Sequence, residues 1–200
     1  MEFVILLVAL FLLFALLRPL TTLLHELGHA IPALLFTRGP VSVVIGVPKN
    51  LPKDPLFRLL RLRVWISRNP LLWLGGYCSH ELTRTRWEEV IIVLNGVVFS
   101  ALIAVLSTYL SFVFELHGFV RTLLILLTTS TVLDIFLNLV PSGKPVKLPD
   151  GRNTFNDGEL IRRLLTKASD RSWSSAIRLS SSGKHAEAWE IYERALLNDP

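Results

Sequence analysis

His25, Glu26 and His29 form the pattern His-Glu-x-x-His within an apolar run that begins at Phe3. On a helix the two histidines lie one turn apart on the same face, so both imidazole rings can bind one zinc ion. Glu26 then projects beside the water molecule that zinc polarises, where a carboxylate can act as a general base. The pattern predicts a zinc peptidase centre with one Zn²⁺ per chain, two histidine ligands and Glu26 as the catalytic residue.

A third metal ligand must come from an Asp, Glu or His elsewhere in the chain. Asp157 is the first candidate, because it follows a loop that leaves the last apolar segment and it opens a predicted helix. Asp150, which is also followed by glycine, is the second candidate. Asp134 lies inside an apolar segment, where an ionisable group is costly and therefore indicates function. Its alternative role is structural, as the partner of Arg18, Arg121 or a hydroxyl group inside the helix bundle.

Asn95 and Asn138 place amide side chains within otherwise apolar segments. A peptide bond must leave its helix before it can be cleaved, and amides can pair with the exposed backbone groups. We therefore predict that both residues bind substrate, with ordinary interhelical hydrogen bonding as the alternative. His80 and His117 are expected at the membrane interface rather than as metal ligands.

The composition is that of an integral membrane protein. Of the 200 residues, 51% are hydrophobic and 18% are charged, the mean hydropathy is +0.49, and the apolar residues gather in long runs. The net charge of +5 does not indicate nucleic-acid binding, because the basic residues flank apolar segments and no recognition motif accompanies them. The single cysteine, Cys78, excludes an intramolecular disulfide framework.

Three apolar segments are long enough to cross a lipid bilayer, at about residues 3–35, 90–114 and 119–140. The first is expected to bend at Pro19. Because this segment continues past Pro19 into the histidine motif, it does not fit a cleaved signal peptide.

The charges between the first two spans predict the orientation of the chain. Residues 36–89 contain nine basic residues (Arg38, Lys49, Lys53, Arg58, Arg61, Arg63, Arg68, Arg84, Arg86) and four acidic ones (Asp54, Glu81, Glu88, Glu89). The positive-inside rule puts this stretch in the cytoplasm. Three crossings then leave the N-terminus outside and the C-terminus cytoplasmic.

Between the first two spans we predict a small β-hairpin or sheet at the membrane surface, within residues 36–75. Residues 41–47 and 59–66 fit two strands, because they are rich in branched apolar residues or alternate apolar with basic ones.

After the third span, residues 141–154 have the glycine and proline content of a loop, and residues 159–165 have a helical pattern. Asn156 or Asp157 is a candidate N-cap of that helix, which is the alternative to a role for Asp157 in metal binding.

The chain divides into a predicted membrane-embedded protease domain, residues 1–165, and a helical tail, residues 166–200. The spacing of small residues, a turn glycine and a final proline in the tail resembles one tetratricopeptide repeat (Ala176, Gly183, Ala188, Tyr192, Ala195, Pro200). One copy cannot bury its own apolar face. The tail is therefore expected to pack on the membrane domain, to bind a protein partner or to begin an array, with an ordinary amphipathic helical hairpin as the alternative.

Taken together, these features resemble the site-2 protease family of intramembrane zinc metalloproteases. The matching residues lie within about 15–165: LHELGH at 24–29, LGGY at 74–77, Asn95-Gly96, FLNLVP at 136–141 and NDG at 156–158. The resemblance implies a mostly α, polytopic membrane protein with a three-helix catalytic core. It also implies zinc held by two histidines and an aspartate, and cleavage of transmembrane substrates close to the cytosolic leaflet.

Two details of the resemblance concern single residues. Asn138 matches the family's substrate-clamping asparagine. In many members the aspartate closely follows the Asn-x-x-Pro turn, whereas Asp157 lies 16 residues after Pro141 in this chain.

The leading hypothesis is therefore a zinc-dependent endopeptidase that cleaves transmembrane proteins within the bilayer. The alternative is a non-catalytic, metal-bound membrane scaffold or chaperone that binds partners through its tail, and the presence of Glu26 argues against it. A metal transporter is a third hypothesis, weakened because three spans leave little room for a transport pathway.

Overall fold

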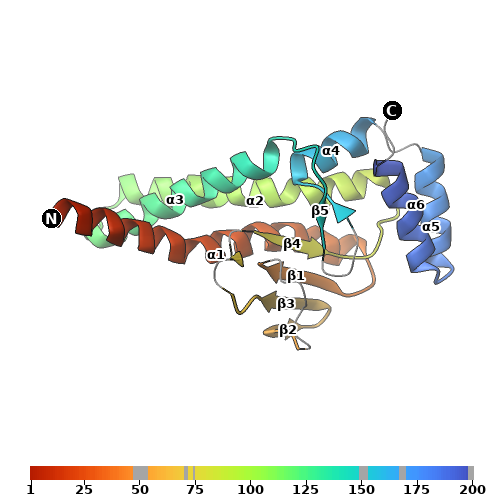
Figure 1. The fold of residues 1–200 in the computed structure, drawn as a ribbon, viewed down its shortest axis with the longest axis horizontal. Coiled ribbons are helices and arrows are strands. Elements are labelled where there is room, and N and C mark those ends of the chain that lie inside the picture. Colours follow the sequence, from red (N-terminus) through yellow and green to blue (C-terminus); the bar gives the residue numbers. More distant parts are fainter. Residues whose placement is uncertain (47–53, 70–71, 74, 149–152, 167–169, 198–200) are drawn as a thin grey trace.

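Three long helices run side by side along the longest axis of the protein (Figure 1). The structure is a computed structural model that describes residues 1–46, 54–69, 72–73, 75–148, 153–166 and 170–197. Helices α1 (Glu2–Phe36), α2 (Arg86–Val113) and α3 (Gly118–Leu139) are, within these described residues, the three helices that are long and apolar enough to cross a membrane. They confirm the mostly helical fold class and coincide with the three predicted apolar segments, with α2 beginning before the expected residue 90.

Local sequence explains where two of these helices begin and end. At the start of α2, Thr85 and Glu88 form a capping box, in which each side chain accepts a hydrogen bond from the backbone of the other residue. At the end of α1, the Arg61 guanidinium donates to the carbonyl oxygens of Leu34 and Thr37, each at 2.5 Å. Arg61 thereby satisfies two carbonyls that a helix end leaves unpaired.

Close packing and polar contacts hold the three helices together. A Cβ atom on Gly28 of α1 would lie 2.9 Å from the Cα atom of Gly96 in α2, so these backbones approach too closely for a larger residue. Thr21 and Ser130 join α1 to α3 through their hydroxyls at 2.9 Å. Helices associate in lipid mainly through close packing of small residues and through interhelical hydrogen bonds. Burying apolar side chains contributes little there, because the lipid tails around them are equally apolar.

Arg18 of α1 and Asp134 of α3 form a buried ion pair inside this bundle. An Arg18 Nη atom lies 2.7 Å from Asp134 Oδ1, and Arg18 also donates to the carbonyl and hydroxyl oxygens of Ser130. Both side chains are about 95% buried. Asp134 thus has the structural role named as its alternative, and of the partners considered it is Arg18 that binds it.

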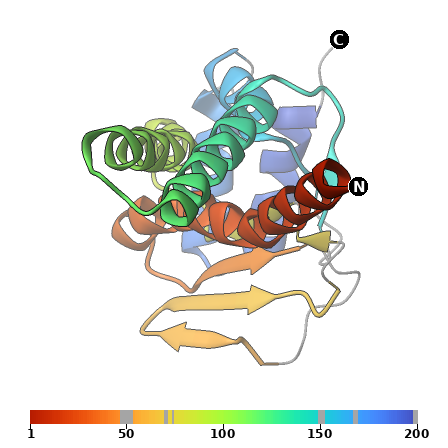
Figure 2. The same cartoon turned by 90° about the vertical axis from the view of Figure 1, so that its left-hand side faces the viewer.

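A four-stranded sheet lies beside the C-terminal half of α1. Its strands are β1 (Val41–Ile45), β2 (Phe57–Leu59), β3 (Leu62–Ile66) and β4 (Gly76–Ser79), in the order β2-β3-β1-β4. Figure 2 shows β1 near the helices and the β2–β3 hairpin farther from them. Ala30 and Ala33 of α1 form one core cluster with apolar side chains of β1 and β3.

Two strand predictions need correction. The single strand expected over residues 59–66 is two antiparallel strands, because Leu60 adopts a positive φ of 52° and turns the chain. The strand expected over residues 41–47 ends at Ile45, and Val47 lies outside the described residues. Strand β4 lies beyond the predicted β segment of residues 36–75 and was missed.

After α3 the chain forms short strands β5 (Val146–Lys147) and β6 (Asn153–Thr154), then α4 (Asp157–Thr166), α5 (Asp170–Ser181) and α6 (His185–Leu197). The antiparallel pairing of β5 with β6 corrects the prediction of a plain loop over residues 141–154. The helix expected at 159–165 is α4, which begins two residues earlier.

The α5–α6 hairpin packs on the membrane domain. Trp173, Tyr192 and Leu196 share a core cluster with Val90 and Val93 of α2. The Leu196 carbonyl accepts a hydrogen bond from Arg163 in α4. Of the three arrangements predicted for the tail, the structure has the first, since this apolar face is covered by the chain itself.

The turn of this hairpin lies at Gly183, which has a positive φ of 81°. Helices and a turn at these positions fit the predicted helical hairpin, but nothing identifies them as a tetratricopeptide repeat, and that assignment stays a prediction.

The Arg18–Asp134 pair gives a prediction about stability. Asp134→Leu should lower the free energy of unfolding by about 3–5 kcal/mol, because it leaves the Arg18 guanidinium buried without its counter-charge. The double variant Arg18→Met, Asp134→Leu should recover most of this loss, because it removes both charges and keeps the volume filled. Unfolding in mixed micelles, followed by circular dichroism, measures both values. Equal destabilisation by the single and double variants would contradict the interpretation.

Candidate metal centre and active-site cavity

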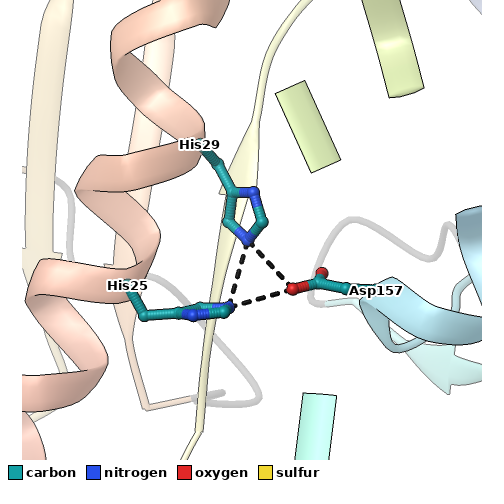
Figure 3. A group of neighbouring side chains, drawn as sticks. All are labelled: His25, His29 and Asp157. Carbon is teal, nitrogen blue, oxygen red and sulfur yellow. Dashed lines mark hydrogen bonds and ion pairs between the residues drawn. The ribbon is translucent and has the colours of Figure 1, made fainter. Parts of the chain in front are cut away.

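The predicted metal ligands come together at one point between α1 and α4 (Figure 3). Asp157 Oδ2 lies 3.0 Å from His25 Nε2 and 3.4 Å from His29 Nε2, and the two Nε2 atoms are 3.2 Å apart. The two imidazole rings are almost perpendicular to each other, at 89°. All three side chains therefore direct a donor atom to the same small space.

This triangle fits a zinc ion. With bond lengths of 2.0–2.1 Å, two ligand atoms of a tetrahedral zinc site lie about 3.3 Å apart. The three distances between ligand atoms, 3.0, 3.2 and 3.4 Å, lie on both sides of this value. Two imidazoles with one carboxylate are also a common donor set for zinc. Burial alone would raise the pKa of Asp157, but a protonated His29 and the hydrogen bonds that both histidines donate outweigh it and hold the pKa well below its usual range, so the carboxylate is anionic. A bound metal ion would replace the protons on the Nε2 atoms. The group therefore presents an anionic oxygen and two ring nitrogens.

The other ring nitrogen of each histidine has its own partner. The Ile92 carbonyl lies 2.8 Å from His29 Nδ1, and the Ser100 hydroxyl lies 3.0 Å from His25 Nδ1. A carbonyl can only accept, so His29 Nδ1 carries the proton and its Nε2 can bind a metal. Such partners fix the ring orientation and strengthen metal ligands.

Asn156 positions Asp157 at the start of α4. Its amide nitrogen donates to the carbonyls of Leu137 and Val140 at the end of α3, at 3.1 and 2.5 Å. Its oxygen accepts from the backbone nitrogens of Ser142 and Glu159. Asn156 is therefore the N-cap, which leaves the Asp157 carboxylate available to the site.

The next residue, Gly158, allows α4 to approach α3 closely. A Cβ atom there would lie 1.9 Å from the carbonyl oxygen of Leu139. The second candidate ligand, Asp150, lies outside the described residues.

Glu26 lies buried beside the two histidines on α1. A Cβ atom on Gly76 would be 3.0 Å from Glu26 Oε1, so this carboxylate lies against β4, which is an edge strand of the sheet. Glu26 lines two cavities, one of about 200 Å³ that it shares with His29 and one of about 100 Å³ that it shares with His25.

The larger cavity lies between elements that are distant in sequence. Strand β4 lines it over residues 76–79, the β5–β6 hairpin contributes Val146 and Asn153, and helix α6 contributes Trp189, Tyr192 and Leu196. The cavity therefore has a strand beside the Glu26 carboxylate and aromatic side chains of the C-terminal hairpin in its wall.

The two predicted substrate-binding asparagines lie in different surroundings. Asn138 lines both cavities, and its amide nitrogen donates to the Asp134 carbonyl at 3.0 Å. The Asn95 amide donates to the Gly28 carbonyl at 2.6 Å, an interhelical bond of the kind named as its alternative. A role in substrate binding stays a prediction for both.

Three other residues considered from the sequence stand apart from the metal group. His80 lies 3.6 Å from Glu89 and also contacts the Glu81 carbonyl. His117 caps the start of α3. Cys78 lines the larger cavity, but burial and the nearby Glu26 raise the pKa of its thiol well above the usual value, so it is a neutral thiol rather than a nucleophile.

Sequence reasoning missed Gly96 as part of the site, together with Ser100 and the Ile92 carbonyl. A Cβ atom on Gly96 would lie 2.2–2.7 Å from atoms of the His29 ring, so the absence of a side chain makes room for the imidazole. Gly96 and Ser100 are four residues apart within an apolar span. This small-residue spacing is typical of a close helix–helix contact and could have indicated them.

Gly96→Ala tests this contact. The added methyl group should displace the His29 ring and weaken metal affinity roughly 10- to 100-fold, as loss of a supporting contact does at other metal sites. Competition with a fluorescent zinc chelator measures the affinity. Gly118→Ala is the matched control, because a Cβ atom there meets nothing within 4 Å. Equal affinity in both variants would show that Gly96 does not position His29.

Comparison with known proteins gives the family. A search of curated proteins and a search of solved structures return no significant match to this chain. A family model described as Peptidase family M50, the site-2 protease family, matches residues 10–188, which include the histidine motif, Asp157 and most of the described helices. This match favours a peptidase over the non-catalytic scaffold. With the three apolar helices, it identifies the chain as a membrane protein that belongs to peptidase family M50.

Proposed function

We propose that this protein is a zinc-dependent intramembrane endopeptidase that hydrolyses peptide bonds of transmembrane substrates near the cytosolic leaflet. The observation that carries the proposal is the convergence of His25, His29 and Asp157 beside Glu26, at a cavity bounded by the candidate membrane helices, strand β4 and helix α6. His25, Glu26 and His29 are three polar side chains on one candidate membrane helix, which is costly unless they have a function.

His25, His29 and Asp157 would hold the zinc ion. When bound, zinc would supply Lewis-acid chemistry, which polarises water and the scissile carbonyl. Glu26 takes a proton from the attacking water and passes it to the leaving amine. The Ile92 carbonyl and the Ser100 hydroxyl keep the imidazoles in the orientation that presents Nε2 to the site.

The surroundings of the site support an unwound substrate. A helical peptide bond is protected by its own hydrogen bonds, so the segment to be cleaved must become extended. Strand β4 is an edge strand of the sheet and lines the cavity next to Glu26, where an extended segment can run beside it. Asn138 lies at the same cavity, with its amide side chain within reach of exposed backbone groups.

The orientation of the chain is part of the proposal. Arg58, Arg61 and Arg63 lie on the hairpin beside the C-terminal end of α1, and α4–α6 lie at the same end of the bundle (Figure 1). The positive-inside rule places this end in the cytoplasm, with the N-terminus of α1 outside. Cleavage would then occur near the cytosolic leaflet.

Glu26→Gln tests the catalytic assignment. The variant should lose cleavage of a reconstituted single-span substrate, because an amide cannot accept the proton from water, yet it should fold and bind zinc like the wild type. Product formation in proteoliposomes and bound metal by mass spectrometry measure the two properties. Glu115→Gln, at an exposed position between α2 and α3, is the control. Wild-type turnover by Glu26→Gln would refute the proposal.

The zinc content of purified variants tests the ligands. Wild-type protein should carry one zinc ion per chain, whereas His25→Ala and Asp157→Ala should carry much less, since each removes one of three protein ligands. Asp150→Ala should keep its zinc if Asp157 is the third ligand. The opposite result, with zinc lost in Asp150→Ala and kept in Asp157→Ala, would move the ligand role to Asp150.

A further inference from the structure

The β2–β3 hairpin exposes apolar side chains that the peptidase chemistry does not use. Leu56 is 71% exposed, Phe57 51%, Leu59 57% and Leu60 92%. These four large apolar residues lie within five positions, and Phe57 and Leu59 share one face of β2. Exposed apolar groups that lie close together commonly mark a contact with a partner or a membrane.

The opposite face of the hairpin carries two arginines side by side. Arg58 and Arg63 are directly opposite each other in the antiparallel register of β2 and β3, so their side chains project from the same face. Like charges in this arrangement repel each other. Among the described residues, the structure gives neither guanidinium a hydrogen bond or an ion pair, whereas Arg61 between them is bound to the end of α1.

The register of β2 and β3 shows that the apolar residues and the two arginines lie on opposite faces of the hairpin. Phe57 and Leu59 pair with Val64 and Leu62, which belong to the core cluster against α1. Because side chains alternate along a strand, the two arginines face away from that cluster. The hairpin is therefore amphipathic, with an apolar side toward the membrane helix and a basic side away from it.

The hairpin also lies next to apolar surface of a candidate membrane helix. Arg61 fixes its turn to the last residues of α1. On that part of α1, Ile31 and Leu35 are 48% and 76% exposed, so the end of the membrane helix next to the hairpin presents apolar surface as well. Amphipathic elements in this position bury their apolar side in the acyl-chain boundary and place basic groups among the headgroups.

We propose that Arg58 and Arg63 form a binding site for the phosphate of an anionic phospholipid, whose acyl chains pass the free edge of β2 and pack on Phe57 and Leu59 on the other face. Arginine binds phosphate through paired hydrogen bonds, and one phosphate between two guanidinium groups removes their repulsion. A free anion would satisfy the arginines but would leave the exposed apolar residues uncovered, so the lipid is the ligand that fits both surfaces.

Lipid binding to the full-length protein tests the site. Detergent-solubilised protein is titrated with phosphatidylglycerol or phosphatidylcholine, and bound lipid is counted by native mass spectrometry. The wild type should prefer phosphatidylglycerol, and the double variant Arg58→Gln, Arg63→Gln should bind it roughly 10- to 30-fold more weakly, as expected for two basic groups near anionic lipid. The control Lys184→Gln, Arg194→Gln removes the same charge from the exposed tail and should bind like the wild type.

Two further arms make the result decisive. The single variant Arg58→Gln changes only an exposed edge residue and should still weaken binding at least threefold, which covers the case in which the double variant does not fold. Inorganic phosphate at millimolar concentration should not displace phosphatidylglycerol. Displacement by phosphate, or equal binding by the arginine and tail variants, would overturn the proposal.

A spin label locates the hairpin independently of lipid counting. Cys78→Ser removes the single cysteine of the chain, and Leu60→Cys then provides one labelling position at the exposed turn. In phosphatidylglycerol nanodiscs the label should be more accessible to oxygen than to a water-soluble nickel complex. The reverse accessibility would place the turn in water and would overturn the proposal. These measurements do not involve peptide cleavage, so they can fail while the peptidase assignment stands.

Discussion

The centre of this protein depends on a carboxylate from beyond the third helix reaching two imidazoles on the first. Asp157 and His25 are separated by 132 residues, yet their ligand atoms are 3.0 Å apart. Asn156 makes this possible, because its amide ties the start of α4 to the end of α3, and Gly158 permits the close approach. The distance between α3 and α1 then determines where the carboxylate lies.

That distance is maintained by polar contacts inside the bundle. The Arg18–Asp134 pair and the Thr21–Ser130 bond connect α1 to α3 one or two turns before His25. On the other side of α1, the glycines at 28 and 96 bring α2 close enough for the Ile92 carbonyl to reach His29. Each of the two histidines is therefore oriented by a contact whose partner comes from α2.

The parts of this arrangement that could be predicted from sequence are local. The histidine spacing, the three apolar spans and the helix after Asn156 follow from patterns within single segments, and the structure has all of them. The partners of the imidazoles could not be predicted, because a serine or a backbone carbonyl becomes a partner only once α1 and α2 are packed.

The sheet shows a second limit of sequence patterns. Residues 60–64 alternate between apolar and basic side chains, and no glycine or proline marked the turn. Leu60 adopts a backbone conformation that glycine or asparagine usually provides. Asp134 shows a third limit, because a carboxylate at its position in an apolar segment is compatible with either a functional or a structural role. Only the position of Arg18 distinguishes the two.

Helix α6 contributes Trp189, Tyr192 and Leu196 to the wall of the cavity that contains Glu26 and His29. The C-terminal hairpin is thus part of the wall of the candidate active-site cavity rather than a separate appendage. A recombinant fragment that stopped after α4 would keep all three predicted metal ligands but would lack the part of the cavity wall that α6 forms. Biochemical work on this enzyme therefore requires a polypeptide that extends through residue 197.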